Sequence, residues 1–193
     1  LRVLNEVDLI AAEDTRHSVK LLNHFEISKP LTSYFEHNKD TKGIYLINKL
    51  LEGENIALIS DAGMPGISDP GEDIIKQAIE HNIDIEVLPG ATASITALVG
   101  SGLETAKFAF EGFLDRDKKV RRNQLEELKE ERRTIIFYES PHRLKDTLKD
   151  MLKVLGNRRI AVNREITKKY QEIIREDIET VINIFNEKEV KGE

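Results

Sequence analysis

The chain has 193 residues and a mass of 22.0 kDa, which leaves room for one large domain or two small ones. Its 39% hydrophobic and 33% charged residues are interleaved, as in folded globular proteins, and the net charge of −6 argues against a protein that coats nucleic acid with its whole surface. The absence of cysteine excludes disulfides and thiolate metal sites, and no apolar run approaches a membrane span, so we expect a cytoplasmic protein without a membrane partner.

In the first half of the chain, short apolar runs alternate with longer amphipathic runs. After an amphipathic helix at the start, the pattern predicts strands over Val7–Ala12, Leu31–Phe35, Asn55–Ser60 and Asp84–Leu88, with helices over Thr41–Leu51 and Glu72–Glu80. This order is typical of a parallel sheet covered by helices. Asn55–Ser60 is almost wholly apolar, which predicts a central strand buried on both faces.

A second α/β block begins near Lys107. The alternating run FAFEGFL is followed by a predicted helix over Lys118–Glu131, a strand over Thr134–Tyr138, a helix over His142–Leu155, a strand over Arg159–Asn163 and a helix over Ile178–Asn186. We place the boundary within Gly100–Thr105, which gives domains over residues 1–102 and 103–193.

The loop SDAGMPGISDPG, from Ser60 to Gly71, lies between a predicted strand and a predicted helix. It matches neither a dinucleotide fingerprint nor a phosphate loop. A structural interpretation is a long turn in which Asp69 caps the next helix. However, twelve residues exceed the usual length of such loops, and ligands of α/β sheets bind beyond the carboxyl ends of strands, so the loop favours a ligand site.

Further glycine, proline and polar residues follow other predicted strands. LPGATASITALVGSG, from Leu88 to Gly102, indicates either close helix packing or a second wall of the same pocket, with Thr92 or Ser94 as a helix cap. Glu139–Arg143 follows one strand and opens a helix with Pro141, and His142 there is either a base or an ordinary residue of the helix start. Asn163–Tyr170 follows another strand, where Arg164 and Glu165 form either a surface ion pair or a phosphate contact.

Charged residues also follow the first predicted strand. Asp14 and Thr15 are expected to cap a helix, whereas Glu13 and Arg16 have no evident structural task. A basic segment over residues 116–122 is either a solvated helix face or an RNA contact.

Six segments carry motifs in a fixed order: VDLIAAEDTRHSVKLLNHF, ISDAGMPGISDPG, VLPGATASITALVGSGL, FEGFL, FYESPHRL and NREITKKYQE. With these segments the chain resembles, from Leu1 to about Phe185, the family of small-subunit ribosomal RNA ribose 2′-O-methyltransferases, which has the tetrapyrrole-methylase fold. The resemblance implies two α/β domains with a mostly parallel first sheet and a mixed second sheet. The family begins with a further strand and a Thr-Pro-Ile-Gly-Asn-Leu loop and closes this region with another strand, so we expect these terminal strands to be missing here.

The resemblance implies S-adenosyl-L-methionine as cofactor, in a cleft between the domains, a cytidine ribose of small-subunit ribosomal RNA as substrate, and a homodimer. The implied cofactor-binding residues are Asp61, Ala62, Gly63, Pro65, Gly66, Ile67, Ser68, Asp69, Pro70, Pro89, Gly90, Ala91, Thr92, Ala93, Ser94 and Ser140. The catalytic candidates are Glu139, Arg164 and Glu165, and Glu13 is a further carboxylate at a strand end. The candidate RNA contacts are Arg16, Lys118, Lys119, Arg121, Arg122, Lys168 and Lys169.

Two other functions remain open at this point. One is a methylase of tetrapyrrole precursors, which transfers a methyl group to ring carbon, and the other is a cofactor-binding module without catalysis. The five histidines show no metal-ligand spacing, so we expect methyl transfer without a metal.

Overall fold

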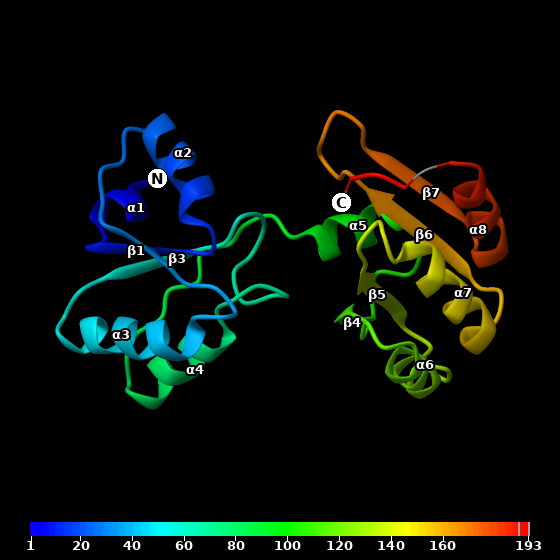
Figure 1. Ribbon diagram of the computed structural model, residues 1–193, viewed down its shortest axis with the longest axis horizontal. Helices are drawn as coiled ribbons and strands as arrows, with labels where there is room; N and C mark the ends of the chain where they lie inside the picture. Colours follow the sequence, from blue (N-terminus) through cyan, green and yellow to red (C-terminus); the bar gives the residue numbers. More distant parts are fainter. Residues whose placement is uncertain (189, 193) are drawn as a thin grey trace. The chain divides into compact units, whose positions relative to one another are not determined.

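The computed structural model describes residues 1–188 and 190–192, and the chain forms two compact units, Leu1–Ala91 and Thr92–Glu193 (Figure 1). The second unit therefore begins before the expected boundary at residues 102 and 103. The reason is the helix α5 (Ala93–Ser101), which packs against strands of the second unit. None of the helices in the described part of the chain is long and apolar enough to cross a membrane.

The first unit is built on a parallel sheet. Its elements in chain order are α1 (Arg2–Glu6), β1 (Leu9–Ala12), α2 (Thr15–His24), β2 (Leu31–Ser33), α3 (Lys39–Leu51), β3 (Ile56–Ile59) and α4 (Glu72–Glu80). The three strands are arranged in the order β2-β1-β3 and all run parallel.

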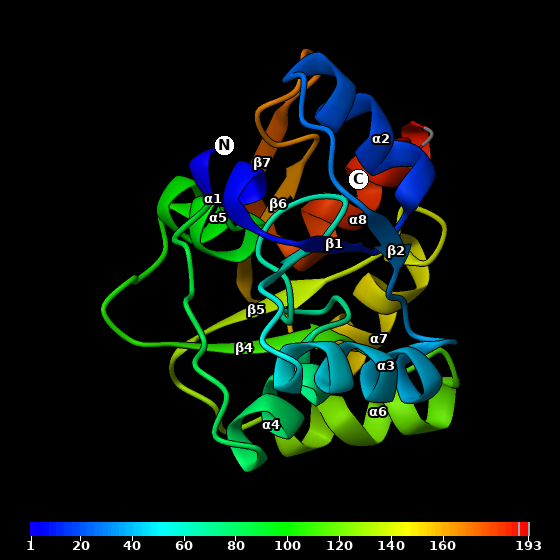
Figure 2. The same cartoon turned by 90° about the vertical axis from the view of Figure 1, so that its left-hand side faces the viewer.

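Helices cover both faces of this sheet (Figure 2). Ile10 of β1 packs with Leu22 in the core beneath α1 and α2, whereas Leu9 and Ala11 pack with Leu46 in the core beneath α3 and α4. This alternation is the period of two that a strand imposes on its side chains. The first unit is thus a three-layer α/β/α sandwich.

Two predictions about the strands of the first unit are wrong. The central strand is β1, whose four residues are all buried, whereas β3, within Asn55–Ser60, lies at the edge and is only half-buried. Asp84–Leu88 forms no strand, although its pattern is that of one. Its side chains are exposed, and no segment in the described part of the chain pairs with its backbone, so it lacks the ladder that defines a strand.

The second unit contains two short strand pairs. After α5 come β4 (Phe108–Phe113), α6 (Lys118–Glu127), β5 (Thr134–Tyr138), α7 (Leu144–Leu155), β6 (Arg159–Arg164), β7 (Glu172–Asp177) and α8 (Ile178–Glu187). β4 and β5 pair in parallel, and β6 and β7 form an antiparallel hairpin. The strand β7 was not expected, because three of its six residues, EIIRED, are acidic and its apolar pattern is short.

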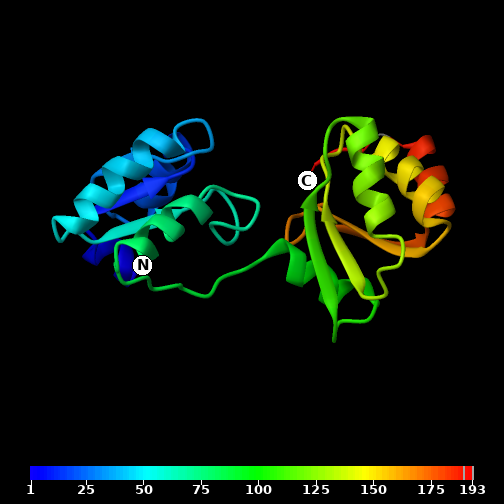
Figure 3. The same ribbon diagram turned by 90° about the horizontal axis from the view of Figure 1, so that it is seen from below.

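Helices lie on both faces of these strands (Figure 3). Val162 and Ile174, which are paired across the hairpin, face the core formed with α6, α7 and α8. Asn163 and Ile173, the next pair, face Gly100 of α5. The hairpin is therefore covered on both faces, whereas residues 167–171 at its tip are exposed.

Candidate functional site

The carboxyl ends of β1 and β3 lie side by side at one edge of the first unit's sheet. Ala12 pairs with Ile59, and the next residue, Glu13, donates its backbone N–H to the Ile59 carbonyl at 3.2 Å. In return, Glu13 Oε2 accepts a hydrogen bond from the backbone N–H of Asp61 at 3.2 Å. Glu13 thus holds the first turn of the glycine-rich loop, which is the structural role that the sequence left open.

The glycine-rich loop folds back so that its last residue, Gly71, contacts Gly66 in its middle. Gly66 has φ +80° and Gly71 has φ +152°, in the region that favours glycine. A Cβ added to Gly71 would lie 3.0 Å from the backbone nitrogen of Gly66 and 3.1 Å from its Cα. Only glycine fits this approach without a shift of the backbone.

Asp69 lies in this loop and does not cap α4. The N-cap of that helix is Gly71, which makes no side-chain capping bond, so the capping interpretation is wrong. Partial burial raises the pKa of Asp69 above its ordinary value, and the neighbouring carboxylates Glu13 and Asp61 add to the rise, whereas a hydrogen bond with Ser60 opposes it. The negative charge of Asp69 is therefore unfavourable in the free protein, and a bound cation would stabilise it.

A pocket of about 660 Å³ opens beside this loop. Four of its lining residues belong to the predicted cofactor set: Gly66, Ser68, Asp69 and Pro70. The others are Glu13, Phe35, Glu36, Lys39 and Glu72. Phe35 and Glu36 were missed as site residues. They follow β2, and the signal that identifies them is that the carboxyl ends of parallel strands share one edge of a sheet.

The residues after β1 form a second polar group at this edge. Asp14 caps α2 as expected and forms a bidentate pair with Arg16, whose Nη2 lies 2.7 Å from Asp14 Oδ2. His17 Nδ1 lies 3.6 Å from Asp61 Oδ1. The Arg16 side chain is 90% exposed, so it can contact a large ligand without unfavourable burial.

The predicted cofactor segment Pro89–Ser94 is divided between the two units. In the first unit, a Cβ on Gly63 would lie 3.7 Å from the carbonyl oxygen of Ala91, so this end of the segment lies close to the glycine-rich loop. In the second unit, Thr92 is the N-cap of α5 without a side-chain bond, and Ser94 donates its backbone N–H to the Tyr138 hydroxyl at 3.1 Å.

The turn after β5 is organised by Glu139, whose side chain is only 8% exposed. Its Oε1 accepts a hydrogen bond from the Ser140 N–H at 2.8 Å and its Oε2 accepts one from the Thr147 hydroxyl at 2.5 Å. Arg143 Nε lies 3.5 Å from the same carboxylate, and α7 begins at Leu144 after this turn. Both oxygens of Glu139 therefore hold the local structure together.

Arg164 and Glu165 follow β6. Arg164 Nε lies 3.1 Å from Glu172 Oε2 across the hairpin, and its Nη1 donates to the Lys191 carbonyl at 2.6 Å. Glu165 Oε1 lies 3.1 Å from Lys168 Nζ. These contacts make Arg164 and Glu165 part of the hairpin's ion-pair network.

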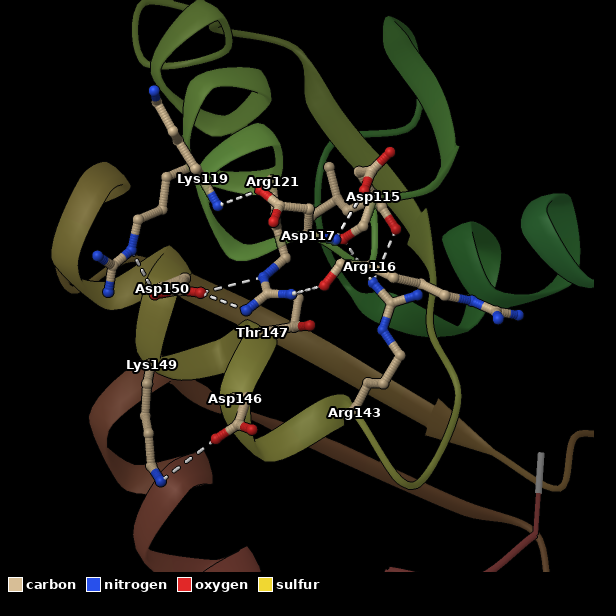
Figure 4. A network of polar contacts seen from close by, with 12 residues as sticks. Asp115, Arg116, Asp117, Lys119, Arg121, Arg143, Asp146, Thr147, Lys149 and Asp150 are labelled. Carbon is tan, nitrogen blue, oxygen red and sulfur yellow. Dashed lines mark hydrogen bonds and ion pairs between the residues drawn. The ribbon is translucent and has the colours of Figure 1, made fainter.

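The basic segment at α6 divides into an exposed part and a buried part (Figure 4). Lys118 and Lys119 are exposed. In contrast, the Arg121 side chain is only 7% exposed and lies 2.6 Å from Asp150 of α7, and Arg122 Nε lies 2.7 Å from the other oxygen of Asp150. Arg121 cannot reach a phosphate without breaking this pair, so its expected RNA contact conflicts with its burial. Arg122 also uses its Nε to bind Asp150, but its side chain is 34% exposed.

Comparisons with known proteins agree with this architecture. The family model of tetrapyrrole (corrin/porphyrin) methylases matches residues 1–182. A protein of Halalkalibacterium halodurans named ribosomal RNA small subunit methyltransferase I is 55% identical over the whole chain and 67% of its own length. Proteins of the same name from Bacillus subtilis and Thermotoga maritima are 53% and 44% identical, over 98% and 100% of this chain and 65% and 86% of their own lengths.

The chain belongs to this methyltransferase family, within the tetrapyrrole methylases. It spans about two thirds of the length of the first two relatives. Among solved structures, a cobalt precorrin-4 methyltransferase matches with a TM-score of 0.67 and 16% identity over 98% of this chain and 82% of its own. A Thermus thermophilus uroporphyrin III C-methyl transferase complexed with S-adenosyl homocysteine matches with a TM-score of 0.61 and 15% identity, over 98% and 84%. The expected fold class is confirmed.

S-adenosyl-L-methionine is the cofactor of the family, and the pocket of the first unit fits several of its chemical features. Its volume lies within the range of about 300 to 1,000 Å³ typical of small-molecule sites. The carboxylates of Glu13 and Asp69 complement positive charge, which the cofactor carries on its sulfonium and ammonium groups, and Phe35 offers an apolar face. The glycines of the loop let its backbone approach a ligand closely.

Proposed function

We propose that this chain is the methyl-transferring part of an enzyme that uses S-adenosyl-L-methionine to methylate the 2′-hydroxyl of a cytidine ribose in small-subunit ribosomal RNA. The observation that carries the proposal is the similarity to relatives named for small-subunit ribosomal RNA methylation, which extends over all of this chain at 44 to 55% identity. The specificity for cytidine and for the 2′-oxygen comes from the family resemblance of the motifs.

In this proposal the glycine-rich loop holds the cofactor, and Pro89–Ser94 and Ser140 remain the other predicted cofactor contacts. The cofactor supplies an electrophilic methyl group bound to sulfur. The residues of the chain hold the ribose oxygen in line with that methyl carbon, because alignment removes much of the barrier of a two-reactant step. When the ribose oxygen is methylated, a base of the chain would take up the hydroxyl proton.

We assign Glu13 as the proton acceptor of this reaction. One of its oxygens holds the Asp61 N–H, and the carboxylate lines the pocket of the first unit. Glu139 and Glu165, the alternatives, have carboxylates committed to contacts of the second unit. Together with Arg164 they position the ends of β5 and β6. Arg16, Lys118, Lys119, Lys168 and Lys169 remain the proposed phosphate contacts.

The substitution Glu13→Gln tests this assignment. Glutamine keeps an oxygen that accepts from the Asp61 N–H, but it cannot take up a proton near neutral pH. We expect kcat to fall about 10²- to 10⁴-fold while cofactor affinity is retained. An unchanged kcat would exclude Glu13 as the acceptor.

A tetrapyrrole precursor is the alternative substrate, and it is favoured by the fold of the solved neighbours. Those structures are at most 18% identical to this chain, so they support the fold and not the substrate. Methyl transfer assays with uroporphyrinogen III and with small-subunit RNA, run in parallel, distinguish the two. We expect transfer to RNA alone.

A further inference from the structure

The tip of the β6–β7 hairpin, residues 165–171, carries an exposed aromatic side chain between polar neighbours. In Figure 1 it is the orange loop that joins the two strands. Tyr170 is 69% exposed, more than any other aromatic side chain that the structure describes. Lys169 Nζ lies 5.5 Å from the centre of the Tyr170 ring, and Lys168 precedes it. A flat π-surface and positive charge therefore lie together at the tip.

Hydrogen bonds within the tip hold it in one conformation. The Gln171 side chain accepts from the Thr167 N–H at 2.6 Å, and the Gln171 N–H donates to the Lys168 carbonyl at 3.2 Å. The Lys168 N–H donates to the Glu165 carbonyl at 3.0 Å. Tyr170 is thus presented from a closed turn and not from a loose end.

The backbone of the tip is strained. Glu165 has φ +51° and Thr167 has φ +65°, in the left-handed region that residues with a side chain rarely adopt. A β-branched threonine is especially unfavourable there, and such strain persists mainly at functional sites. Packing does not explain why this conformation presents Tyr170, because most of the ring is in solvent.

The combination fits single-stranded nucleic acid. Proteins bind unpaired bases by stacking them on exposed aromatic rings, while nearby lysines neutralise the backbone phosphates. Single exposed aromatic residues are common on protein surfaces, so exposure alone would carry nothing. At this tip, exposure occurs together with a strained, hydrogen-bonded turn and a lysine over the ring. The positive charge here is local, because the chain as a whole has a net charge of −6.

We propose that Tyr170 stacks on an unpaired base of the RNA substrate and that Lys169 contacts a phosphate beside it. This inference rests on the proposed function, because it assigns the surface that holds that substrate. It assigns Tyr170 a role in binding RNA and none in the chemical step.

Fluorescence anisotropy with a labelled, mixed-sequence, single-stranded RNA oligonucleotide tests the proposal. Tyr170→Ala should weaken binding by about tenfold, because base stacking on an aromatic ring is lost, whereas Tyr170→Phe keeps a ring and should bind within about twofold of the native chain. Lys169→Gln should weaken binding and reduce its dependence on salt.

Tyr45→Ala is the matched control. Tyr45 is 41% exposed on α3 and also has lysines over its ring, Lys42 at 5.0 Å and Lys49 at 5.6 Å. Those cations are already engaged, Lys42 with the Thr32 hydroxyl at 3.0 Å and Lys49 with Glu54 at 2.6 Å. We expect Tyr45→Ala to leave RNA affinity unchanged. An equal loss in both alanine variants would show that the hairpin has no special role and would overturn the proposal.

A tryptophan reports the stacking directly, because the native chain has none. The fluorescence of Tyr170→Trp should be quenched when RNA is added, and that of Tyr45→Trp should not change. Unquenched fluorescence of Tyr170→Trp with bound RNA would overturn the proposal.

Calorimetric titration with S-adenosylhomocysteine separates failure of this inference from failure of the proposed function. Tyr170→Ala should bind the cofactor product as the native chain does, and loss of that binding would mean that the substitution acts through the fold. If the native chain methylates small-subunit RNA and Tyr170→Ala binds RNA equally well, the hairpin proposal alone is wrong. If the native chain neither binds nor methylates RNA, the proposed function and this inference are both wrong.

Discussion

Asp69 is the residue of the pocket whose charge is least favourable in the free protein. Partial burial, with Glu13 and Asp61 nearby, raises its pKa above the ordinary value. A carboxyl group whose folded-state pKa is raised contributes stability that is present at low pH and is lost as the pH rises through that pKa. At neutral pH the ionised Asp69 therefore opposes folding.

The substitution Asp69→Asn should consequently raise the melting temperature at pH 7. The gain should shrink as the pH falls toward the ordinary aspartate pKa of about 3.9, where the native carboxyl group is also neutral. Thermal melts across this range measure the effect, and Asp84→Asn, at an exposed aspartate outside the pocket, is the control. A lower melting temperature for Asp69→Asn at pH 7 would contradict this account of Asp69.

Single residues also show what the sequence could not decide. The basic residues of 116–122 lie close together in the sequence, but Arg121 is buried on Asp150 whereas Lys119 is exposed. The partner lies 29 positions away on another helix, so no local pattern indicates it. The hydrogen bond that Glu13 accepts from the Asp61 N–H could not be predicted for the same reason, because Asp61 lies 48 positions further along the chain.

At the level of elements, the glycine-rich loop depends on the close approach of Gly71 to Gly66. In Gly71→Ala the added Cβ would meet the Gly66 backbone at 3.0 Å, at a φ of +152° that alanine rarely adopts. We expect a loss of about 1 to 3 kcal/mol in the free energy of unfolding and weaker cofactor binding. Urea denaturation and calorimetry measure the two.

Gly90→Ala is the matched control for that loop. Gly90 lies in the other predicted cofactor segment, and an added Cβ there meets no atom within 4 Å. Its substitution should change the free energy of unfolding by less than about 0.5 kcal/mol. Equal stability of the two variants would mean that the Gly66–Gly71 contact does not hold the loop.

The contact between α6 and α7 is centred on Asp150 (Figure 4). Burial alone would raise the pKa of its carboxyl group, but hydrogen bonds from Arg121 and Arg122 outweigh that effect and leave the pKa lowered. The pair therefore stabilises the fold above the ordinary aspartate pKa and loses its contribution as the pH falls through the lowered value.

In Asp150→Asn the buried guanidinium of Arg121 would lose its counter-ion. We expect a cost of about 3 to 5 kcal/mol in the free energy of unfolding, measured by urea denaturation at neutral pH. Asp146→Asn, one turn earlier on the same helix, is the control. Asp146 is 75% exposed with Lys149 at 3.7 Å, so its loss should cost less than about 1 kcal/mol. Similar costs for both variants would contradict the structural role of the buried pair.

The elements also show how far periodicity predicts this fold. Helices such as Glu72–Glu80 and strands such as Thr134–Tyr138 are found where the apolar spacing places them, because each buries one face. Asp84–Leu88 has the spacing of a strand but no partner, and pairing is not a local property. Conversely, β7 is a strand despite its charges, because it pairs along its whole length with β6.

At the scale of the whole molecule, the parallel order of the first sheet is what links sequence to function. Because β1, β2 and β3 run in the same direction, the residues after each of them meet at one edge, and the predicted loop joins Glu13 and Phe35 there. The sequence indicated the loop but not these neighbours, since the strand order that brings them together is set by packing. The expected homodimer remains a prediction, which light scattering of the purified chain would test.

The most direct test of the central claim is transfer of labelled methyl from S-adenosyl-L-methionine to small-subunit ribosomal RNA, followed by alkaline hydrolysis. A 2′-O-methyl group blocks alkaline cleavage at its own nucleotide, so the account predicts label in a single alkali-resistant dinucleotide that begins with cytidine. Label in alkali-sensitive mononucleotides would place the methyl group on a base and would contradict the account.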